Sequence, residues 1–560
     1  MTDDGPTGSE TPDDAVDDPY VLSGSQPHDF WAESVAKRII ERNPDDPIAI
    51  KGGISPSGVP HLGNMNEIAR GYFVAEALRD RGRTVRQIFT ADDRDPLRKV
   101  PRKLADLDGN VVGLDEVDAG ALGRNLGKPY TAIPDPFGCC DSYGAHFSNL
   151  IERSAELLDI PVETVSNTER YESGAFDDVI HQLLEHREQA RSVLAKYQDK
   201  VDDDYVPFRP ICAECGHVTE TDAVQSVDLD AETVEYVCTD VEAGDRIIEG
   251  CGHEGTATFR EGKLPWRFEW PAQWQVLDVD FEPFGKDHAE GSWPSGADIA
   301  RNVLDDTPPV PMAYEWFTLD GEPFSSSAGH VIMVQDALEF LEPEVLRYFF
   351  TKDPSRARDF SIERANQLVD EFDEFERTYF GEFASGHKME GEAEAAYPML
   401  VESTTEQPIR LPYTFAAVLG MTDDIELREK MARRQDHIPE SAPKRSVEEA
   451  LGRVEYARTW AERVDNAYNY RLAADLPTTE FDATTAAALD DLADFVEAGH
   501  DGEAIQSEIF ETARRHDLDP GDLFAAGYRL FFDTDQGPQL GTFLADLDRA
   551  FVVHRLRREA

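Results

Sequence analysis

A turn rich in glycine, proline and serine, residues 53–64, constrains this chain more than any other stretch. It reads Gly-Ile-Ser-Pro-Ser-Gly-Val-Pro-His-Leu-Gly-Asn. The apolar run at 47–50 precedes it and an amphipathic segment beginning near Met65 follows it, which predicts a buried strand, a turn and a helix. The helix start offers unpaired N–H groups and a positive dipole end to an anion. The segment therefore predicts a nucleotide site with His61 at its mouth.

Two residues of this turn have side-chain properties that suit ATP. His61 adds a donor for a phosphate, and Gly63 leaves room for an adenine to lie flat against the chain. A histidine and a glycine at this spacing also recur by chance, so the alternative is a Gly/Pro turn with an exposed histidine. The strand before the turn and the helix after it favour the nucleotide site.

The stretch from Pro56 to Asn64 resembles the HIGH signature of class I aminoacyl-tRNA synthetases. Residues 72–83 and 88–101 are similar to the class I lysyl-tRNA synthetases in particular. This resemblance spans about residues 28–558 and is weak over 386–520. It implies ATP-dependent attachment of L-lysine to tRNA(Lys) through a lysyl-adenylate, the reaction of a lysine–tRNA ligase, with ATP and Mg²⁺ as the substrate complex.

The resemblance also implies roles for individual residues. The residues implied in ATP binding are Pro56, His61, Gly63, Asn64, Ser325 and Ser326. Those implied in catalysis are His61, Asn64, Ser325, Ser326 and Ser327. Those implied in binding the amino acid are Gly53, Ser55, Trp266, His288 and Tyr314.

The second half of such a site is expected in the serine-rich loop that begins at Pro323. It reads Pro-Phe-Ser-Ser-Ser-Ala-Gly-His, where the family usually has K-M-S-[KS]-S-K-G. Both lysines are absent, with Pro323 and Ala328 in their places, although such lysines offset charge on the pyrophosphate in the transition state. Serine hydroxyls, backbone N–H groups, Mg²⁺ and His330 are the candidates to replace them. The alternative is a flexible loop without a catalytic role.

A lysine substrate needs an aromatic wall along its methylenes and a carboxylate at its ammonium. The aromatic stretch 264–271 and the polar triplet 286–288 suit that need, although aromatic stripes more often belong to a core. The sequence leaves four candidates for the carboxylate, none of which stands out: Asp92, Glu269, Asp287 and Glu315.

Four of the six cysteines lie in one segment, at Cys212, Cys215, Cys238 and Cys251. In a reducing cytoplasm their spacing favours a structural zinc site over disulfides. His217 or His253 can replace one cysteine in the ligand set, and unmetallated cysteines are the alternative to zinc. The other two, Cys139 and Cys140, are adjacent and cannot easily bridge each other.

Periodicity predicts the order of the elements. Helix 29–42 precedes a β-α-β unit made of strand 48–52, helix 64–81 and strand 85–90, which implies a parallel sheet. Further predicted elements are helix 145–158, strand 161–166, helix 174–198 and strands 274–279 and 311–318. The fold class is therefore α/β: a Rossmann-type catalytic domain with a zinc-ribbon-like insert, followed by an all-α domain.

These elements suggest a domain plan. The expected parts are an acidic disordered tail at 1–27, a catalytic domain at 28–340 with its insert at 204–262, and a helical domain at 341–560 that binds the tRNA anticodon. Segment 386–412 is polar and poorly periodic, so it is expected as a surface excursion.

The net charge of −58, from 112 acidic and 54 basic residues, is extreme. Acidity usually argues against nucleic-acid binding. Here the acids are spread along the chain and Arg outnumbers Lys, a pattern that favours adaptation to high salt, where screening shortens repulsion to roughly 3 Å at 1 M. Without a membrane span or signal peptide in the sequence, a cytoplasmic monomer is expected.

Three other functions compete with lysine attachment. One is a related class I synthetase for glutamate or arginine, and another is an impaired paralogue that binds tRNA, supported only by the lysines missing from 323–329. A nucleotidyltransferase acting on a small molecule leaves the cysteine-bearing insert and the long helical part unexplained.

Overall fold

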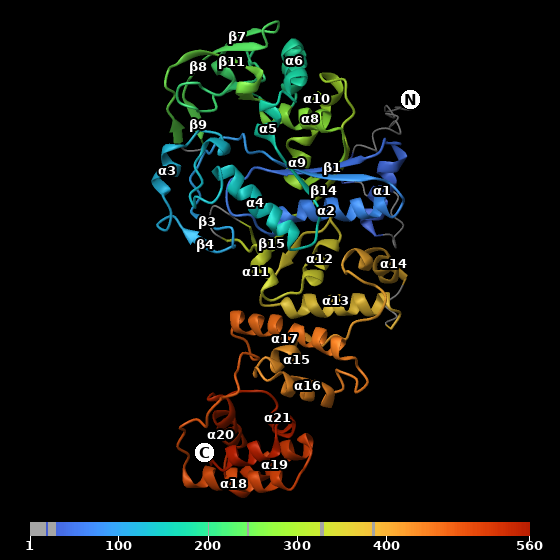
Figure 1. Ribbon diagram of the computed structural model, residues 1–560, viewed down its shortest axis with the longest axis vertical. Coiled ribbons are helices and arrows are strands. Elements are labelled where there is room, and N and C mark those ends of the chain that lie inside the picture. The colour runs from blue at the N-terminus through green and yellow to red at the C-terminus, as the bar shows by residue number, and fades with distance from the viewer. Residues whose placement is uncertain are drawn as a thin grey trace, which may run out of the picture. The chain divides into compact units, whose positions relative to one another are not determined.

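The computed structural model describes residues 18–20, 30–199, 201–243, 246–324, 330–382 and 387–559. The chain divides into two compact units, whose segments are interleaved along the sequence (Figure 1). The first unit comprises Met1–Asp336, Leu346–Phe360 and Ala384–Glu402, and the second Ala337–Val345, Ser361–Phe383 and Ser403–Ala560.

A five-stranded sheet forms the centre of the first unit. Its strand order is β14-β13-β1-β2-β5, and all four pairings are parallel. The strands are β14 (Val310–Tyr314), β13 (Val279–Gly285), β1 (Ile48–Ile54), β2 (Val85–Ala91) and β5 (Glu163–Ser166). The predicted Rossmann-type sheet is thus confirmed, and its carboxyl edge is where such sheets bind ligands.

Helices cover both faces of this sheet (Figure 1). Helix α2 (Leu62–Arg79) lies on one face, where a Cβ on Gly71 would come 3.3 Å from Ile50 Cγ2, so glycine permits the close approach of helix and strand. Ala49, which points the other way along β1, shares a core cluster with Trp270 and Trp274 of helix α8 (Trp266–Leu277).

Two predicted elements differ from the structure. The strand predicted at 274–279 is wrong, because α8 continues to Leu277 and β13 begins only at Val279. Aromatic residues favour strands in isolation, but here the tryptophans of α8 pack into the core. The helix predicted at 174–198 is two helices, α6 (Asp177–Glu185) and α7 (Arg187–Leu194), which meet at His186.

The cysteine-bearing insert is a small β structure. Strands β7 (Val224–Asp228), β8 (Thr233–Val237) and β11 (Glu254–Thr258) form an antiparallel sheet. Its buried residues join a core cluster with residues of α6 and α7. The insert therefore packs on helices of the first unit.

Later segments of the chain complete the first unit. Trp31 in α1 (Trp31–Glu41) donates from Nε1 to the carbonyl of Thr351 at 2.7 Å, and Tyr72 Oη donates to the carbonyl of Met399 at 3.2 Å. Tyr397 and Leu400 are fully buried. The prediction of a surface excursion at 386–412 is therefore wrong for residues 397–400, because the apolar side chains there are buried in the first unit.

Little of the predicted N-terminal tail is described. Within Asp18–Tyr20, the carbonyl of Pro19 accepts a hydrogen bond of 2.8 Å from Ala313 N, on edge strand β14. The rest of that prediction lies outside the described residues.

Helices make up the second unit in the part that the structure describes. They are α13 (Ala365–Tyr379), α15 (Tyr413–Leu419), α16 (Ile425–Arg434), α17 (Lys444–Val464), α18 (Ala483–Glu497), α19 (Gly502–Arg515), α20 (Pro520–Phe532), α21 (Leu540–Asp546) and α22 (Arg549–Leu556). Arg453 is 3% exposed and binds Glu342 at 2.5 Å and Asp373 at 2.6 Å. This buried ion network ties α17 to α13.

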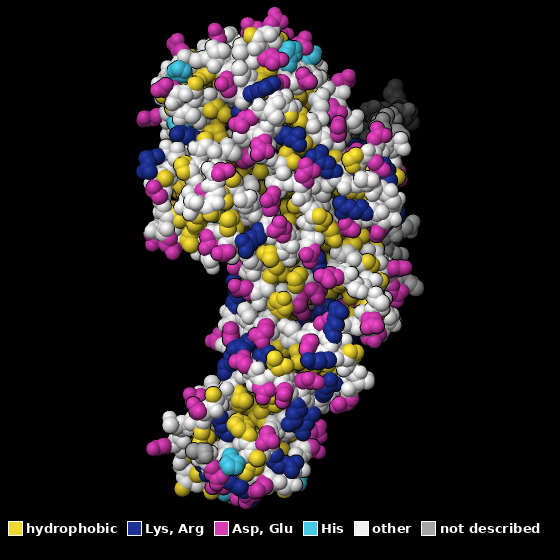
Figure 2. Space-filling view, viewed as in Figure 1, with side chains coloured by type: hydrophobic (Ala, Val, Ile, Leu, Met, Phe, Trp, Pro, Cys, Tyr) yellow, Lys and Arg dark blue, Asp and Glu magenta, His cyan; other side chains and the backbone are white. Residues whose placement is uncertain are grey.

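Acidic side chains are dispersed over the visible face of the molecule rather than gathered in one place (Figure 2). Among the described residues, no helix has the length and apolarity that crossing a lipid bilayer requires.

Candidate functional site

The turn after β1 holds its histidine in a defined state. His61 is the N-cap of α2: its Nδ1 accepts from Gly63 N at 3.1 Å, and Asn64 Oδ1 accepts from His61 N at 2.9 Å. Burial lowers the pKa of His61 to about 4. The ring is therefore neutral near pH 7, and because Nδ1 is the acceptor, its proton lies on Nε2.

Both capping side chains keep donors for a ligand. His61 retains Nε2–H and Asn64 retains its amide Nδ2, and neither atom has a hydrogen-bond partner among the described residues. The ring of Phe324 is stacked on His61 with centroids 4.9 Å apart, so the start of the serine-rich loop reaches this turn. Donors directed from a helix start suit phosphate oxygens.

A cavity of about 720 Å³ opens beside this turn, at the carboxyl edge of the sheet. All the residues predicted to bind the amino acid line it, as do three of the predicted ATP-binding residues: Gly53, Ser55, Trp266, His288, Tyr314, His61, Gly63 and Asn64. Pro56 is buried and is not among its lining residues. Trp266 is stacked on Trp270 at 5.3 Å, and His288 lies 5.3 Å from Trp270, which gives the cavity an aromatic wall.

One carboxylate of the cavity has a cation of its own. Glu282, which is 2% exposed, pairs with Lys51 at 2.7 Å and accepts from Trp270 Nε1 at 2.9 Å. Trp274 Nε1 also donates to it. The two charges of this pair neutralise each other, so the pair can offer little net charge to a ligand.

Glu67 on α2 is in a different position. Its Oε1 accepts from Gly53 N at 2.6 Å, its Oε2 accepts from Tyr314 Oη at 2.9 Å, and no cation pairs with it among the described residues. Burial, assisted by the charge of Glu282, raises the pKa of Glu67 to about 7. A cationic ligand would stabilise the ionised form of such a carboxylate.

Asp92, just beyond β2, is a second carboxylate of the cavity that pairs with no cation among the described residues, and it is buried. Its Oδ1 accepts from Asn167 at 2.6 Å and Gln273 at 3.0 Å, and its backbone N donates to Ile54 O at 2.8 Å. Burial, followed by the charges of Glu269 and Asp95, raises the pKa of Asp92 to about 8. It therefore lies beside the turn capped by His61 and also favours a cation.

The other predicted carboxylates are less suited. Glu269 pairs with Lys263 at 2.6 Å, and Glu315 pairs with Lys286 at 2.6 Å; neither lines the cavity. Asp287 lines it, but its side chain is 59% exposed.

Four thiols of the insert converge as the sequence predicts. The sulfurs of Cys212, Cys215, Cys238 and Cys251 all lie within 4.8 Å of one another. Two Sγ–Sγ distances are 3.6 and 3.7 Å, and Zn–S bonds of about 2.3 Å in a tetrahedron require about 3.8 Å. The thiols fit a zinc ion, and neither His217 nor His253 belongs to this group.

A second cluster was missed by the sequence reasoning. Asp135, Cys139, Cys140 and His146 place one ligand atom each within 4.8 Å of the others. His146 donates from Nε2 to the carbonyl of Ala105 at 2.8 Å, so the lone pair of Nδ1 faces the cluster, 3.3 Å from Cys139 Sγ. An acid, two adjacent cysteines and a histidine within twelve residues was the available signal.

Comparison of the sequence with known families identifies one of them. A family model described as "tRNA synthetases class I (K)" matches residues 29–403. The chain belongs to that family. It is 67% identical over 546 residues to "Lysine--tRNA ligase" of Halobacterium salinarum, with 97% of this chain and 99% of that protein covered.

Two further relatives carry the same name. "Lysine--tRNA ligase" of Haloarcula marismortui is 66% identical, covering 97% of this chain and 99% of the relative. The protein of that name from Pyrococcus furiosus is 33% identical, covering 94% and 99% respectively.

The serine-rich loop of this class I (K) synthetase is described only at its ends. Ser325, Ser326 and Ser327 lie outside the described residues. Pro323 and Phe324 line the cavity, whereas His330 Nε2 donates to the carbonyl of Leu319 at 3.0 Å. That bond occupies the ring nitrogen that was expected to help with phosphate.

Two charged residues that line the cavity were missed by the sequence reasoning. Glu67 is four residues after Gly63, and so lies on the same face of α2. Lys51 is two residues before Gly53, on the same face of β1. Extending the helical repeat after Gly63 and the strand repeat before Gly53 by one step each would have found both residues.

Proposed function

We propose that this synthetase attaches L-lysine to tRNA(Lys), using ATP, through a lysyl-adenylate. One observation supports lysine as the amino acid. Among the described residues that line the cavity, two carboxylates that are more than half-buried, Glu67 and Asp92, pair with no cation, and they lie beside an aromatic wall. Lysine has two ammonium groups joined by methylenes, so its charge pattern complements this cavity.

The orientation of lysine follows from where its carboxylate must react. Asp92 adjoins the turn that holds phosphate, so it binds the α-ammonium and leaves the α-carboxylate near ATP. Glu67, with Tyr314 donating to it, binds the ε-ammonium. The methylenes then lie along Trp266 and His288, with Gly53 and Ser55 flanking the substrate.

The turn and the serine-rich loop supply donors to ATP. His61 Nε2 and Asn64 Nδ2 donate to phosphate oxygens, and Gly63 leaves space beside the adenine. Ser325, Ser326 and Ser327, which lie outside the described residues, are proposed to bind the pyrophosphate through hydroxyl and backbone N–H groups. Mg²⁺, which the family uses with ATP, supplies charge neutralisation on the phosphates.

The reaction has two steps. A carboxylate oxygen of lysine attacks the α-phosphorus, forming a P–O bond as the bond to pyrophosphate breaks. A hydroxyl of the terminal tRNA ribose then attacks the lysyl carbonyl, forming the ester and releasing AMP. The residues act chiefly by positioning and by stabilising charge.

The two ligand clusters are proposed as zinc sites. Cys212, Cys215, Cys238 and Cys251 would hold one ion, and Asp135, Cys139, Cys140 and His146 a second. Neither cluster contains a residue that lines the 720 Å³ cavity. Both ions would therefore stabilise local folds rather than take part in chemistry. The helical C-terminal part, 341–560, is proposed to read the anticodon.

The test is charging of tRNA from a halophilic archaeon with each of the twenty amino acids, in molar KCl with ATP and Mg²⁺. Lysine alone should be esterified. Charging with glutamate or arginine instead would refute the lysine cavity, and tRNA binding without any charging would favour the impaired paralogue.

A further inference from the structure

The Lys51–Glu282 pair lies at the floor of the catalytic cavity. Lys51 precedes Gly53 by two residues on β1, and Glu282 precedes Gly285 by three residues on β13. Because a strand advances about 3.3 Å per residue, the two side chains begin roughly 7 and 10 Å further into the sheet than these glycines. A ligand that enters from the carboxyl edge therefore reaches this pair last.

Glu282 has little capacity to accept a further hydrogen bond. Its Oε1 accepts from Lys51 Nζ at 2.7 Å and from Trp270 Nε1 at 2.9 Å. Trp274 Nε1 donates to its Oε2. Since both oxygens of this buried carboxylate already have donors, a ligand cation that reached the floor would find no free acceptor on it.

The ammonium of Lys51 still has donors to offer. An ammonium carries three N–H groups, and among the described residues Glu282 Oε1 is the one acceptor of Lys51 Nζ. The Lys51 side chain is 1% exposed and lines the cavity. From a distance the pair is neutral, but a group that touches it from the cavity meets N–H donors and their positive charge.

Lys51 lies next to the place proposed for the ε-ammonium of the substrate without filling it. A Cβ on Gly53 would lie 3.5 Å from Lys51 Nζ, and Gly53 N donates to Glu67. Burial raises the pKa of Glu67, and the charge of Lys51 acts in the opposite direction. Lys51 nevertheless pairs with Glu282 and not with Glu67 among the described residues. Glu282 thus holds the Lys51 ammonium just beyond the carboxylate that is left for the substrate.

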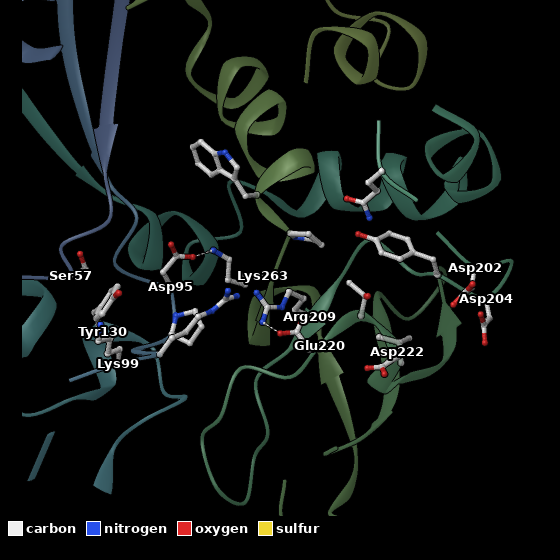
Figure 3. A pocket seen from close by; sticks show the side chains of 18 of the residues that line it. Ser57, Asp95, Lys99, Tyr130, Asp202, Asp204, Arg209, Glu220, Asp222 and Lys263 are labelled. Atoms are coloured by element: carbon white, nitrogen blue, oxygen red, sulfur yellow. Dashed lines mark hydrogen bonds and ion pairs between the residues drawn. The ribbon is translucent and has the colours of Figure 1, made fainter. Parts of the chain in front are cut away.

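A second buried lysine nearby is placed differently. Lys263, which is 2% exposed, pairs with Asp95 and with Glu269, the latter at 2.6 Å. Figure 3 shows its pair with Asp95 in the wall of a neighbouring pocket of about 900 Å³. Lys263 is not among the residues that line the catalytic cavity, so it provides a control for the loss of a buried lysine.

We propose that Lys51 is a specificity-determining residue whose ammonium excludes cationic amino acids with side chains that extend past Glu67. The proposal rests on the proposed function, because it takes Glu67 as the partner of the ε-ammonium. The guanidinium of arginine extends further than the lysine ammonium and would meet the donors of Lys51, a contact that is unfavourable for charge and for hydrogen bonding. Ornithine, one methylene shorter than lysine, does not reach Lys51.

The experiment measures displacement of radiolabelled lysine by unlabelled lysine, arginine and ornithine in equilibrium dialysis at molar KCl. Lys51→Met keeps most of the side-chain length and removes the charge. Lys51→Met/Glu282→Gln also removes the carboxylate that the single substitution leaves without its cation, so it provides the test if the single variant does not fold. Lys263→Met is the matched control, and circular dichroism identifies the folded variants.

The ratio of the Kd for arginine to the Kd for lysine should fall at least about tenfold in the double variant, because its floor carries no charge. It should fall further in Lys51→Met, where Glu282 becomes an acceptor for the guanidinium. The corresponding ratio for ornithine should keep its wild-type value, and Lys263→Met should keep both ratios. An unchanged arginine ratio in the double variant, an equal fall for ornithine, or an equal fall in Lys263→Met would each overturn the proposal.

Charging of tRNA separates this proposal from the proposed function. If wild type charges lysine and the Lys51 variants keep its arginine ratio, the role of Lys51 is refuted and the function stands. If wild type charges no amino acid while the ratios change as expected, the role of Lys51 stands and the function fails.

Discussion

Replacing Glu67 with glutamine should stabilise the ligand-free protein and at the same time remove its affinity for lysine. Burial raises the pKa of Glu67 from 4.5 to about 7. Between those values the folded state holds a proton that the unfolded state has lost, so stability falls as pH rises. A shift of this size corresponds to at most about 3 kcal/mol at pH 8. Glutamine keeps an acceptor for Gly53 N and avoids that cost.

The effect on lysine has the opposite sign. Removing one partner of a buried charge pair costs about 2–5 kcal/mol, which is roughly 30-fold to several thousand-fold in kcat/KM for lysine. Wild-type kcat/KM should rise with pH through about 7, as Glu67 ionises, and again through about 8, as Asp92 ionises. Only the first of these rises should be absent in Glu67→Gln. The KM for ATP should change little, because the phosphate donors lie on His61 and Asn64.

Glu282→Gln is the matched control. It removes a carboxylate from the same cavity, but it strands Lys51, which is 1% exposed and 2.7 Å from Glu282. It should destabilise the protein by about 3–5 kcal/mol. Urea denaturation at pH 8 in molar KCl and lysine-dependent ATP–pyrophosphate exchange, run with tRNA present, measure both effects. A Glu67→Gln protein less stable than wild type, or one with unchanged KM for lysine, would refute the reasoning.

Three other predictions concern metal, packing and salt. Cys212→Ser and Cys139→Ser should each lose a different zinc ion, so emission spectroscopy should find about half of the wild-type zinc in either variant; full metal in both would exclude these ligand sets. Arg453→Ala should destabilise the second unit by about 3–5 kcal/mol in thermal melts, because it leaves Glu342 and Asp373 without their cation; a destabilisation below about 1 kcal/mol would show that the network is not buried in solution. Lowering KCl from roughly 1 M to 0.1 M lengthens screening from about 3 to about 10 Å, so a net charge of −58 should lower the Tm; a flat Tm contradicts adaptation to high salt.

The parts of the fold that sequence reasoning predicted are those set by local chemistry. The turn at 53–64 was found because strand, turn and capped helix are encoded next to one another. Local propensity failed at Trp274, where core packing keeps an aromatic-rich segment helical. Sequence order also could not show that Glu67 meets Tyr314, residues 247 positions apart, since only the fold brings them together.

The candidate site likewise has features that the sequence predicts and features that only the fold shows. The sequence predicted motif residues such as His61. Which of their atoms remain available to a ligand can be known only from the hydrogen bonds of the helix cap. The cluster around His146 was missed because its lone pair is directed by the carbonyl of Ala105, a partner 41 residues away.

The interleaving of the two units decides where this chain can be cut. A fragment ending at residue 340 would delete the carbonyls that Trp31 and Tyr72 bond, those of Thr351 and Met399. It would leave the buried surface of α1 and α2 open to solvent and prone to aggregation. A fragment ending near residue 402 keeps both carbonyls but removes Arg453, the cation that Glu342 and Asp373 bind, so gene fusions should keep the two units of this synthetase together.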